Sequence, residues 1–298
     1  MEKAHRAASG SSWILDKRLS GGWKMIDRDL IKRALAEDLQ GGQDITSVAT
    51  VSGDERIVAD FTARNSGVVA GIDMARAVLE EVGLTDIAVL VKDGASVKSG
   101  EVLMTVRGDT RAILLAERTA LNFLGHLSGI ATLTRTWVDA VAGTKCIIRD
   151  TRKTTPGMRL LEKYAVRMGG GTNHRMSLSD AALIKDNHIA AAGGVAQAFS
   201  KVREKFPTSE IEIEVDTLDQ LREVLPLKPD LVLLDNMSPA QCAEAVSIVA
   251  GATKLEASGG ITLDNAKAYA LTGVQFLAIG ALTHSAPVFD IGLDLRAE

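Results

Sequence analysis

Six short apolar runs recur in the second half of the chain, and nearly every one ends in charged or glycine-rich residues. With their endings, the runs cover 146–153, 182–188, 211–216, 231–236, 254–260 and 276–280. Strand, loop and helix patterns alternate there every ~20–35 residues, which is typical of βα units that build a parallel sheet. In a (β/α) barrel, the carboxyl ends of the strands form the rim that holds the active site. Because unpaired charge is costly to bury, the recurrent polar endings predict a polar ligand at one rim.

The first half of the chain has a different pattern. Its periodicity predicts helices over 27–39, 73–82, 110–126 and 128–142, and strands over 56–63, 86–92 and 101–107. A complete eight-stranded barrel typically needs ~250 residues, more than the second half supplies. We therefore expect an α/β fold in which an N-terminal α/β domain precedes, and caps or closes, an incomplete (β/α) barrel.

These patterns divide the chain into three segments. We assign residues 1–24 to a loose N-terminal extension, 25–125 to the N-terminal α/β domain and 126–298 to the incomplete barrel. The final helices could pack back on the N-terminal domain.

Composition excludes several classes of partner. The net charge is -4, the pI is about 5.8 and aromatic residues make up 4% of the chain, so a nucleic-acid partner is not expected. No apolar stretch is long enough to cross a membrane. The two cysteines, Cys146 and Cys242, are not in a metal-binding spacing. This cysteine usage fits a reducing cytoplasm, where we expect the protein.

Two basic segments are candidates for anion binding. The first, 149–159, follows a predicted strand and contains Arg149, Arg152, Lys153 and Arg159. Arginine makes planar, bidentate contacts with carboxylate or phosphate, while lysine supplies a point charge. A solvated loop is the alternative, which the Thr-Thr-Pro-Gly turn over 154–157 makes weaker.

The second basic segment, 168–175, carries three glycines followed by Thr172, Asn173, His174 and Arg175. Glycines let the backbone approach a ligand closely. No Gly-Lys-Ser/Thr follows, so the segment is not a Walker loop. A single histidine is usually structural, but its place beside Arg175 favours a ligand-binding role for His174.

Lysine and carboxylate residues end three further strands. If residues 185–188 continue a strand, Lys185 and Asn187 share one face, and we take Lys185 as inward and functional. The alternative is a surface lysine. Glu214 and Asp235 end the next two strands and could hold Mg²⁺ together with substrate oxygens. They could also pair with Lys185 or Arg175, and both interpretations can hold.

Two loops of small residues follow the last two strands, at 258–262 and 280–284. Each precedes a predicted helix start. Late loops of (β/α) barrels bind phosphate with backbone N–H groups and helix N-termini. Tight turns are the alternative, but two such loops in consecutive units favour phosphate.

With these residues in hand, the chain resembles the quinolinate phosphoribosyltransferases, also called carboxylating nicotinate-nucleotide pyrophosphorylases. The resemblance runs from about Met25 to the C-terminus. Its motifs are AERTALNF at 116–123, DTRKTTPG at 150–157, GGGTNHR at 169–175, LIKDNH at 183–188, EIEVD at 212–216, LDN at 234–236 and EASGG at 256–260. The long middle motifs are specific to this family. Met168, Ser179 and the longer 40–44 turn depart from the pattern that we expect.

The resemblance implies a barrel with fewer than eight strands and the reaction of quinolinate with phosphoribosyl pyrophosphate and Mg²⁺. It also implies a homodimer, or a higher oligomer built from dimers, in which Arg118 enters the partner's site. The diacid is assigned to Arg118, Arg152, His174, Arg175 and Lys185, with Thr151 also in the substrate site. The metal and ribose are assigned to Glu214 and Asp235, the 5′-phosphate to Ser258, Gly259, Gly260 and Gly280, and the phosphate ends to Lys153 and His284. Lys153, Lys185, Glu214 and Asp235 are the expected catalytic residues.

Three other functions fit the sequence less well. The nearest is the molybdenum-transport-associated relative of the same fold, which the full set of diacid-binding bases disfavours. A non-catalytic phosphate-binding regulator would not need both the bases and the metal carboxylates. A biotinyl or lipoyl carrier is suggested by residues 93–103, but no lysine stands at the hairpin tip that such a carrier needs.

Overall fold

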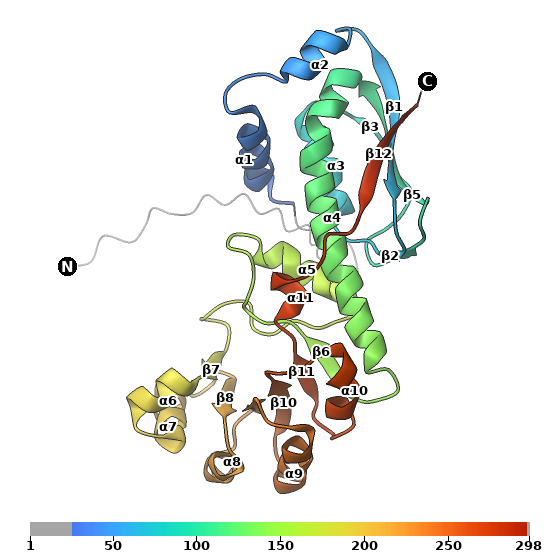
Figure 1. Ribbon diagram of the computed structural model, residues 1–298. Helices are drawn as coiled ribbons and strands as arrows, with labels where there is room; N and C mark the ends of the chain where they lie inside the picture. Colours follow the sequence, from blue (N-terminus) through green and yellow to red (C-terminus); the bar gives the residue numbers. More distant parts are fainter. Residues whose placement is uncertain (1–25, 297–298) are drawn as a thin grey trace, which may run out of the picture. The chain divides into compact units, whose positions relative to one another are not determined.

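The computed structural model describes residues 26–296, which form two compact units (Figure 1). The first unit contains the residues up to Thr132 and those from Pro287 onward, and the second contains Leu133–Ala286. The boundary that we expected near residue 125 therefore lies a few residues later, inside a helix. The expected loose extension over 1–24 lies outside the described residues.

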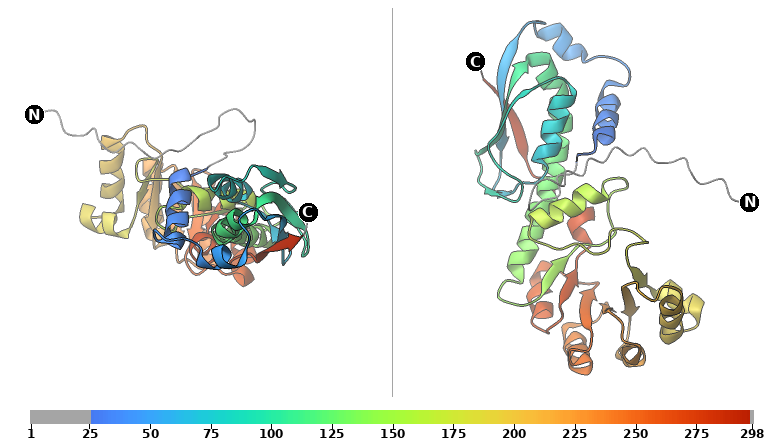
Figure 2. Two further views of the ribbon diagram at one scale, coloured as in Figure 1. Left: turned by 90° about the horizontal axis from the view of Figure 1, so that it is seen from above. Right: turned by 180° about the vertical axis from the view of Figure 1, so that it is seen from behind.

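The first unit is built on a four-stranded antiparallel sheet with the order β12-β1-β5-β3. Its elements are α1 (Arg28–Leu39), α2 (Ile45–Thr50), β1 (Arg56–Ala63), β2 (Gly67–Val68), α3 (Ile72–Glu81), β3 (Asp86–Val89), β4 (Ser96–Val97), β5 (Val102–Asp109), α4 (Thr110–Ala140, which runs on into the second unit) and β12 (Ile291–Arg296). Helices α3 and α4 lie on one face of this sheet (Figures 1 and 2).

Helix α4 is continuous, so the expected division into helices over 110–126 and 128–142 was wrong. Gly125 and Gly129 lie inside this helix, although glycine weakens a helix. Their role is close packing. A Cβ added at Gly125 would lie 2.9 Å from the Phe289 carbonyl oxygen, and one at Gly129 would collide with the Pro287 carbonyl oxygen. The Phe289 N–H also donates to the Gly125 carbonyl oxygen at 2.9 Å.

The end of the chain returns to the first unit as a strand, whereas we had expected final helices to do so. Strand β12 pairs antiparallel with β1, from Ala63 opposite Ile291 to Val58 opposite Arg296. The Arg296 Nε lies 2.8 Å from Asp60 Oδ2 on the neighbouring strand. This pairing was not foreseen, because the partner strand lies more than two hundred residues earlier in the chain.

The second unit confirms the six predicted strands. They form one parallel sheet with the order β6-β11-β10-β9-β8-β7. The strands are β6 (Ile147–Arg149), β7 (Ala182–Ile184), β8 (Ile211–Val215), β9 (Leu231–Asp235), β10 (Lys254–Ser258) and β11 (Phe276–Ala278). Within the described residues, β6 and β7 are the two outer strands, so the sheet is the expected incomplete barrel rather than a closed one.

Helices connect these strands and surround the sheet (Figures 1 and 2). They are α5 (Arg159–Met168), α6 (Asp186–Ala192), α7 (Val195–Lys205), α8 (Leu218–Val224), the short 3₁₀ helix η1 (Leu225–Leu227), α9 (Pro239–Val249), α10 (Leu263–Ala270) and α11 (Ala281–His284). None of the helices in residues 26–296 is both long and apolar enough to cross a membrane.

Strand β8 places charged side chains inside the barrel. All five of its residues are buried, and Glu212 and Glu214 alternate with the apolar Ile211, Ile213 and Val215. Because successive side chains of a strand point to opposite faces, the apolar side chains share one face and the carboxylates share the other. The carboxylate face lies toward the polar interior described below.

The expected strand over 185–188 was wrong. Strand β7 ends at Ile184, and helix α6 begins at Asp186 with Lys185 as its N-cap residue. His188 turns back along this first turn, where its Nδ1 accepts a hydrogen bond from the Lys185 N–H at 3.0 Å. Lys185 and Asn187 therefore do not share a strand face.

Candidate active site

A cavity of ≈ 640 Å³ lies at the carboxyl ends of the strands in the second unit. Every predicted substrate-binding residue except Arg118 lines it: Thr151, Arg152, Lys153, His174, Arg175, Lys185, Glu214, Asp235, Ser258, Gly259, Gly260, Gly280 and His284. Arg118 belongs to the first unit, where its side chain is exposed on α4. Residues that are widely separated in the sequence thus meet at the rim that the strand endings predicted.

Two arginine side chains in this cavity each have a buried donor without a partner. The Nε atoms of Arg152 and Arg175 are buried, and neither has a hydrogen-bond partner among the described residues. Burial lowers the pKa of Arg175, and the nearby charge of Arg152 lowers it further. The Arg175 Nη1 donates to the Ala181 carbonyl oxygen at 2.8 Å, which holds the side chain in place. Because buried donors are normally satisfied, two adjacent unpaired guanidinium N–H groups indicate an anion-binding site.

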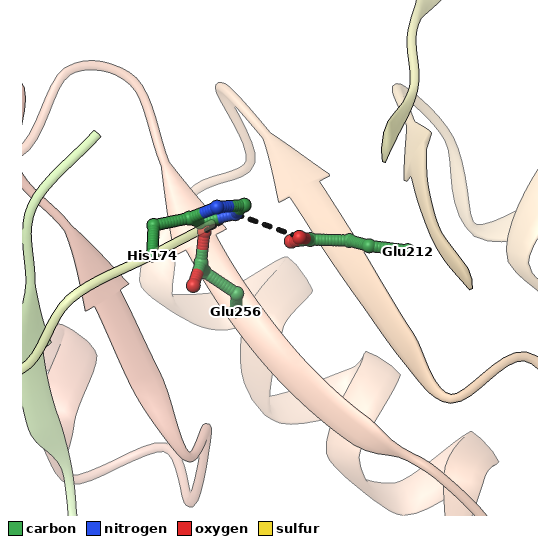
Figure 3. A group of neighbouring side chains, drawn as sticks. All are labelled: His174, Glu212 and Glu256. Atoms are coloured by element: carbon green, nitrogen blue, oxygen red, sulfur yellow. Dashed lines mark ion pairs between the residues drawn. The ribbon is translucent and has the colours of Figure 1, made fainter. Parts of the chain in front are cut away.

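His174 lies beside these arginines, but both of its ring nitrogens face the protein. Its Nδ1 accepts a hydrogen bond from the Arg175 N–H at 2.7 Å, which assigns the proton of the neutral ring to Nε2. Figure 3 shows this ring facing Glu212 and Glu256, with Nε2 2.7 Å from Glu212 Oε2 and 3.6 Å from Glu256 Oε1. The shorter contact lacks the angular geometry of a hydrogen bond. Burial lowers the pKa of His174. Its predicted contact with a ligand would require the ring to turn.

Glu212 and Glu256 were not predicted as site residues. Both are buried, with exposed fractions of 4% and 0%, and burial raises the pKa of each to about 7. The Arg149 Nη1 donates to Glu256 Oε2 at 2.8 Å. A sequence signal existed, since Glu212 alternates with Glu214, and Glu256 lies two residues before Ser258. We call Arg149, Arg152, His174, Arg175, Glu212 and Glu256 the buried end of the site.

A second cluster of carboxylates could hold a cation. Oxygen atoms of Glu214, Asp216 and Asp235 lie within 4.8 Å of one another. Lys185 Nζ forms an ion pair with Glu214 Oε2 at 3.0 Å. The pKa of Asp235 is raised by burial and by the charge of Glu214. Carboxylate oxygens suit a hard cation such as Mg²⁺, so the donor set fits one. Asp216 is an additional candidate ligand that we did not predict.

The glycine loop after β10 adopts a conformation that requires glycine. Gly259 and Gly260 have φ values of +83° and +63°, a region that disfavours residues with a Cβ. A Cβ at Gly259 would also collide with the Asn236 side chain, whose Nδ2 donates to Asp235 Oδ2 at 2.6 Å. Asn236 lines the cavity and was also missed.

The second loop brings Lys153 and His284 together. A Cβ at Gly280 would lie 3.0 Å from Lys153 Cδ and 3.2 Å from His284 Nε2. The Thr283 hydroxyl donates to the Lys153 carbonyl oxygen at 2.7 Å and joins the basic loop to α11. We call Lys185, Glu214, Asp235, the loop over 258–260 and the Gly280 loop the open end of the site.

Comparisons with known proteins cover nearly all of the described chain. Residues 44–128 match the quinolinate phosphoribosyl transferase N-terminal domain, and residues 130–294 match the C-terminal domain. A nicotinate-nucleotide pyrophosphorylase [carboxylating] from Mycobacterium leprae is 54% identical over 274 residues, which covers 90% of this chain and 96% of the relative. A probable enzyme of the same name from Bacillus subtilis is 40% identical over 273 residues, 90% of this chain and 93% of the relative. A crystal structure of nicotinate-nucleotide pyrophosphorylase from Ehrlichia chaffeensis superposes with a TM-score of 0.87 at 40% identity, covering 90% of this chain and 98% of the other.

Proposed function

The chain belongs to the quinolinate phosphoribosyltransferase family, and we infer from this membership that it is a carboxylating nicotinate-nucleotide pyrophosphorylase. It transfers a phosphoribosyl group from phosphoribosyl pyrophosphate to quinolinate and releases nicotinate mononucleotide, pyrophosphate and CO₂. This reaction belongs to de novo NAD biosynthesis. The observation that carries the assignment to this cavity is the pair of buried, unpartnered Nε donors of Arg152 and Arg175.

The buried end of the site suits quinolinate, a small planar dianion. The two unpaired guanidinium donors match the carboxylates of such a ligand in charge and geometry. They are partly buried, so each charge-assisted contact is stronger than it would be in water. Lys185, which pairs with Glu214 at the open end, supplies a further positive charge for the diacid.

The open end of the site suits phosphoribosyl pyrophosphate. We assign the ribose and a divalent cation, expected to be Mg²⁺, to Glu214 and Asp235. The 5′-phosphate is assigned to Ser258, Gly259, Gly260 and Gly280, and the phosphate ends to Lys153 and His284. When it is bound, the cation neutralises phosphate charge, and Mg²⁺ prefers sites that it shares with substrate phosphates.

The chain's own residues act by positioning the reactants and stabilising charge. Departure of pyrophosphate generates an oxocarbenium-like ribose centre, which the ring nitrogen of quinolinate attacks. Lys153 stabilises the departing phosphate charge. While they are bound, the 2-carboxylate and the cations around it stabilise each other, so CO₂ is lost after the nucleotide forms. The bond between C2 and the carboxylate then breaks, its electron pair stays on C2, where the adjacent positively charged ring nitrogen stabilises it, and a proton from solvent replaces the departed CO₂.

We also propose that the working unit is a homodimer, or a higher oligomer built from dimers, in which Arg118 enters the partner's site. The open sheet between β6 and β7 supports this, because a second subunit could cover it. The cysteines are free and buried, which supports the cytoplasm as the compartment.

A direct assay tests the function. The purified protein is incubated with quinolinate, phosphoribosyl pyrophosphate and Mg²⁺, and nicotinate mononucleotide and CO₂ are measured. Nicotinate replaces quinolinate in the control, because it lacks the 2-carboxylate and should not react comparably. Absence of product from quinolinate in folded protein would refute the assignment.

A further inference from the structure

Asp150 and Lys163 form a buried ion pair that is not part of the site described above. Asp150 follows β6 and is 0% exposed, and Lys163 on α5 is 1% exposed. Neither residue lines the cavity. Lysine and aspartate are almost never fully buried without a partner, and desolvating both charges is expensive. The pair therefore calls for a structural or functional reason.

The pair holds the backbone of a cavity residue from both sides. Lys163 Nζ lies 2.5 Å from Asp150 Oδ1. The same Oδ1 accepts the backbone N–H of His174 at 2.8 Å, and Lys163 Nζ donates to the His174 carbonyl oxygen at 2.9 Å. Each member of one ion pair thus satisfies one backbone polar group of the same residue. A hydrophobic pair of similar volume could not make either contact.

Further contacts hold the neighbouring residues on the same framework. The Asn173 Nδ2 donates to Asp150 Oδ2 at 2.6 Å and to the Lys163 carbonyl oxygen at 2.8 Å. Thr172 runs parallel to the end of β6, and its N–H donates to the Ile148 carbonyl oxygen at 2.9 Å. Residues 172–174 are therefore fixed between the outer strand β6 and helix α5.

The next residue is Arg175, whose unpartnered Nε lies in the cavity wall. Its backbone N–H donates to His174 Nδ1, so the peptide that the ion pair holds also sets where Arg175 leaves the chain. The open end of the site lies at the carboxyl ends of β7, β8, β9, β10 and β11, although β8 and β10 also carry Glu212 and Glu256 of the buried end.

We propose that the Asp150–Lys163 pair is a positioning device for the diacid. The pair sets the direction in which His174 and Arg175 enter the cavity, and it thereby determines KM for quinolinate. KM for phosphoribosyl pyrophosphate is determined by the residues of the open end instead. This proposal rests on the function proposed above. Both residues act through their neighbours and touch no substrate themselves.

The test uses the double variant Asp150→Asn/Lys163→Met, which removes both charges and so leaves neither one buried and unpaired. We expect KM for quinolinate to rise about tenfold or more and KM for phosphoribosyl pyrophosphate to stay within about twofold. Hydrogen–deuterium exchange should become faster in peptides covering residues 169–176 and remain unchanged in those covering β9. The control is Arg203→Met, which breaks the ion pair to Asp230 at the opposite end of the strands and should change neither KM.

If the double variant does not fold, Asn173→Ala replaces it, since that change removes one arm of the network and keeps the ion pair. A smaller but still selective rise in KM for quinolinate, with faster exchange over 169–176, is then expected. An unchanged KM for quinolinate in a folded variant, an equal rise in both KM values, or unchanged exchange would each overturn the proposal. Failure of the wild-type enzyme to form nicotinate mononucleotide would instead refute the function, and the exchange measurement would then decide the positioning role by itself.

Discussion

The two ends of the cavity use charge in opposite ways. At the buried end, the carboxylates of Glu212 and Glu256 are 4% and 0% exposed, and each faces a fixed partner on another element. At the open end, the Lys185 side chain is 48% exposed, and Gly259 and Gly260 form the loop after β10 with positive φ values. A preset, desolvated wall suits a rigid aromatic diacid, whereas a more open, glycine-containing rim suits a flexible phosphate ester.

This difference indicates where each kind of binding energy comes from. A preorganised site avoids the free-energy cost of reorienting its dipoles when the ligand arrives, but the fold must already hold its charges in place. The buried end meets that need with Asp150 and Lys163 behind His174. The open end becomes fully ordered only when substrate binds, so removing the cation should affect binding at the open end more than at the buried end.

Removing divalent cations is expected to have the largest effect. Excess EDTA should abolish activity, and added Mg²⁺ or Mn²⁺ should restore it, because the phosphate charge at the open end would otherwise face Glu214 and Asp235 uncompensated. Glu214→Gln and Asp235→Asn should each raise the Mg²⁺ concentration needed for half-maximal rate. The exposed Glu244→Gln variant is the matched control. Full activity in excess EDTA would contradict the assignment of a metal ion to the open end.

Substitution at the buried end should come next in size. Arg152→Ala is expected to lower kcat/KM by about 10- to 150-fold, because each charge-assisted hydrogen bond contributes roughly 1.5–3 kcal/mol. Steady-state kinetics with each substrate varied would show whether the loss falls mainly on quinolinate. Arg222→Ala is the control, since that arginine pairs with Asp219 and Glu244 on the surface. A wild-type-like efficiency in folded Arg152→Ala would contradict the assignment.

Stability should depend on pH through the buried carboxyls. Burial raises the pKa of Glu212 from its ordinary 4.5 to about 7, so between these pH values the folded protein binds more protons than the unfolded chain. The contribution of Glu212 to the free energy of unfolding therefore falls as the pH rises through that window, by up to about 3 kcal/mol. Glu212→Gln cannot titrate, and its urea midpoint should fall less between pH 5 and pH 8 than that of the wild type. Parallel curves for the two proteins would count against the buried carboxyl.

Subunit mixing should give the smallest effect. If Arg118 serves the neighbouring site, Arg118→Ala and Lys185→Ala subunits that exchange should form heterodimers with one intact site. Random exchange makes about half of the dimers mixed, so about a quarter of the wild-type activity should return. Native mass spectrometry measures heterodimer formation beside the assay. Mixed dimers without activity would place Arg118 in its own subunit's site or in no site.

The rim could be predicted from the sequence because its signals are local. Each apolar run marked a strand, and the residue types at its end marked the cavity. The misses have non-local causes. In the sequence, Lys163 is an ordinary helix lysine, and only the fold places Asp150 beside it. The role of Glu256 likewise depends on its contacts with Arg149 and His174, which lie on other elements. The role of Gly125 and Gly129 could not be predicted locally, because the segment that packs on them, residues 287–289, is distant in the sequence.

That returning segment affects how the protein is made. Strand β1 is translated early, but one of its two partners, β12, is translated only after the second unit, Leu133–Ala286. Until then, β1 presents an unpaired edge, the kind of surface on which strands of different chains associate. N-terminal domains usually complete their fold while the rest of the chain is still being synthesised. The first unit cannot do so. Its sheet is completed only after the entire barrel has been translated.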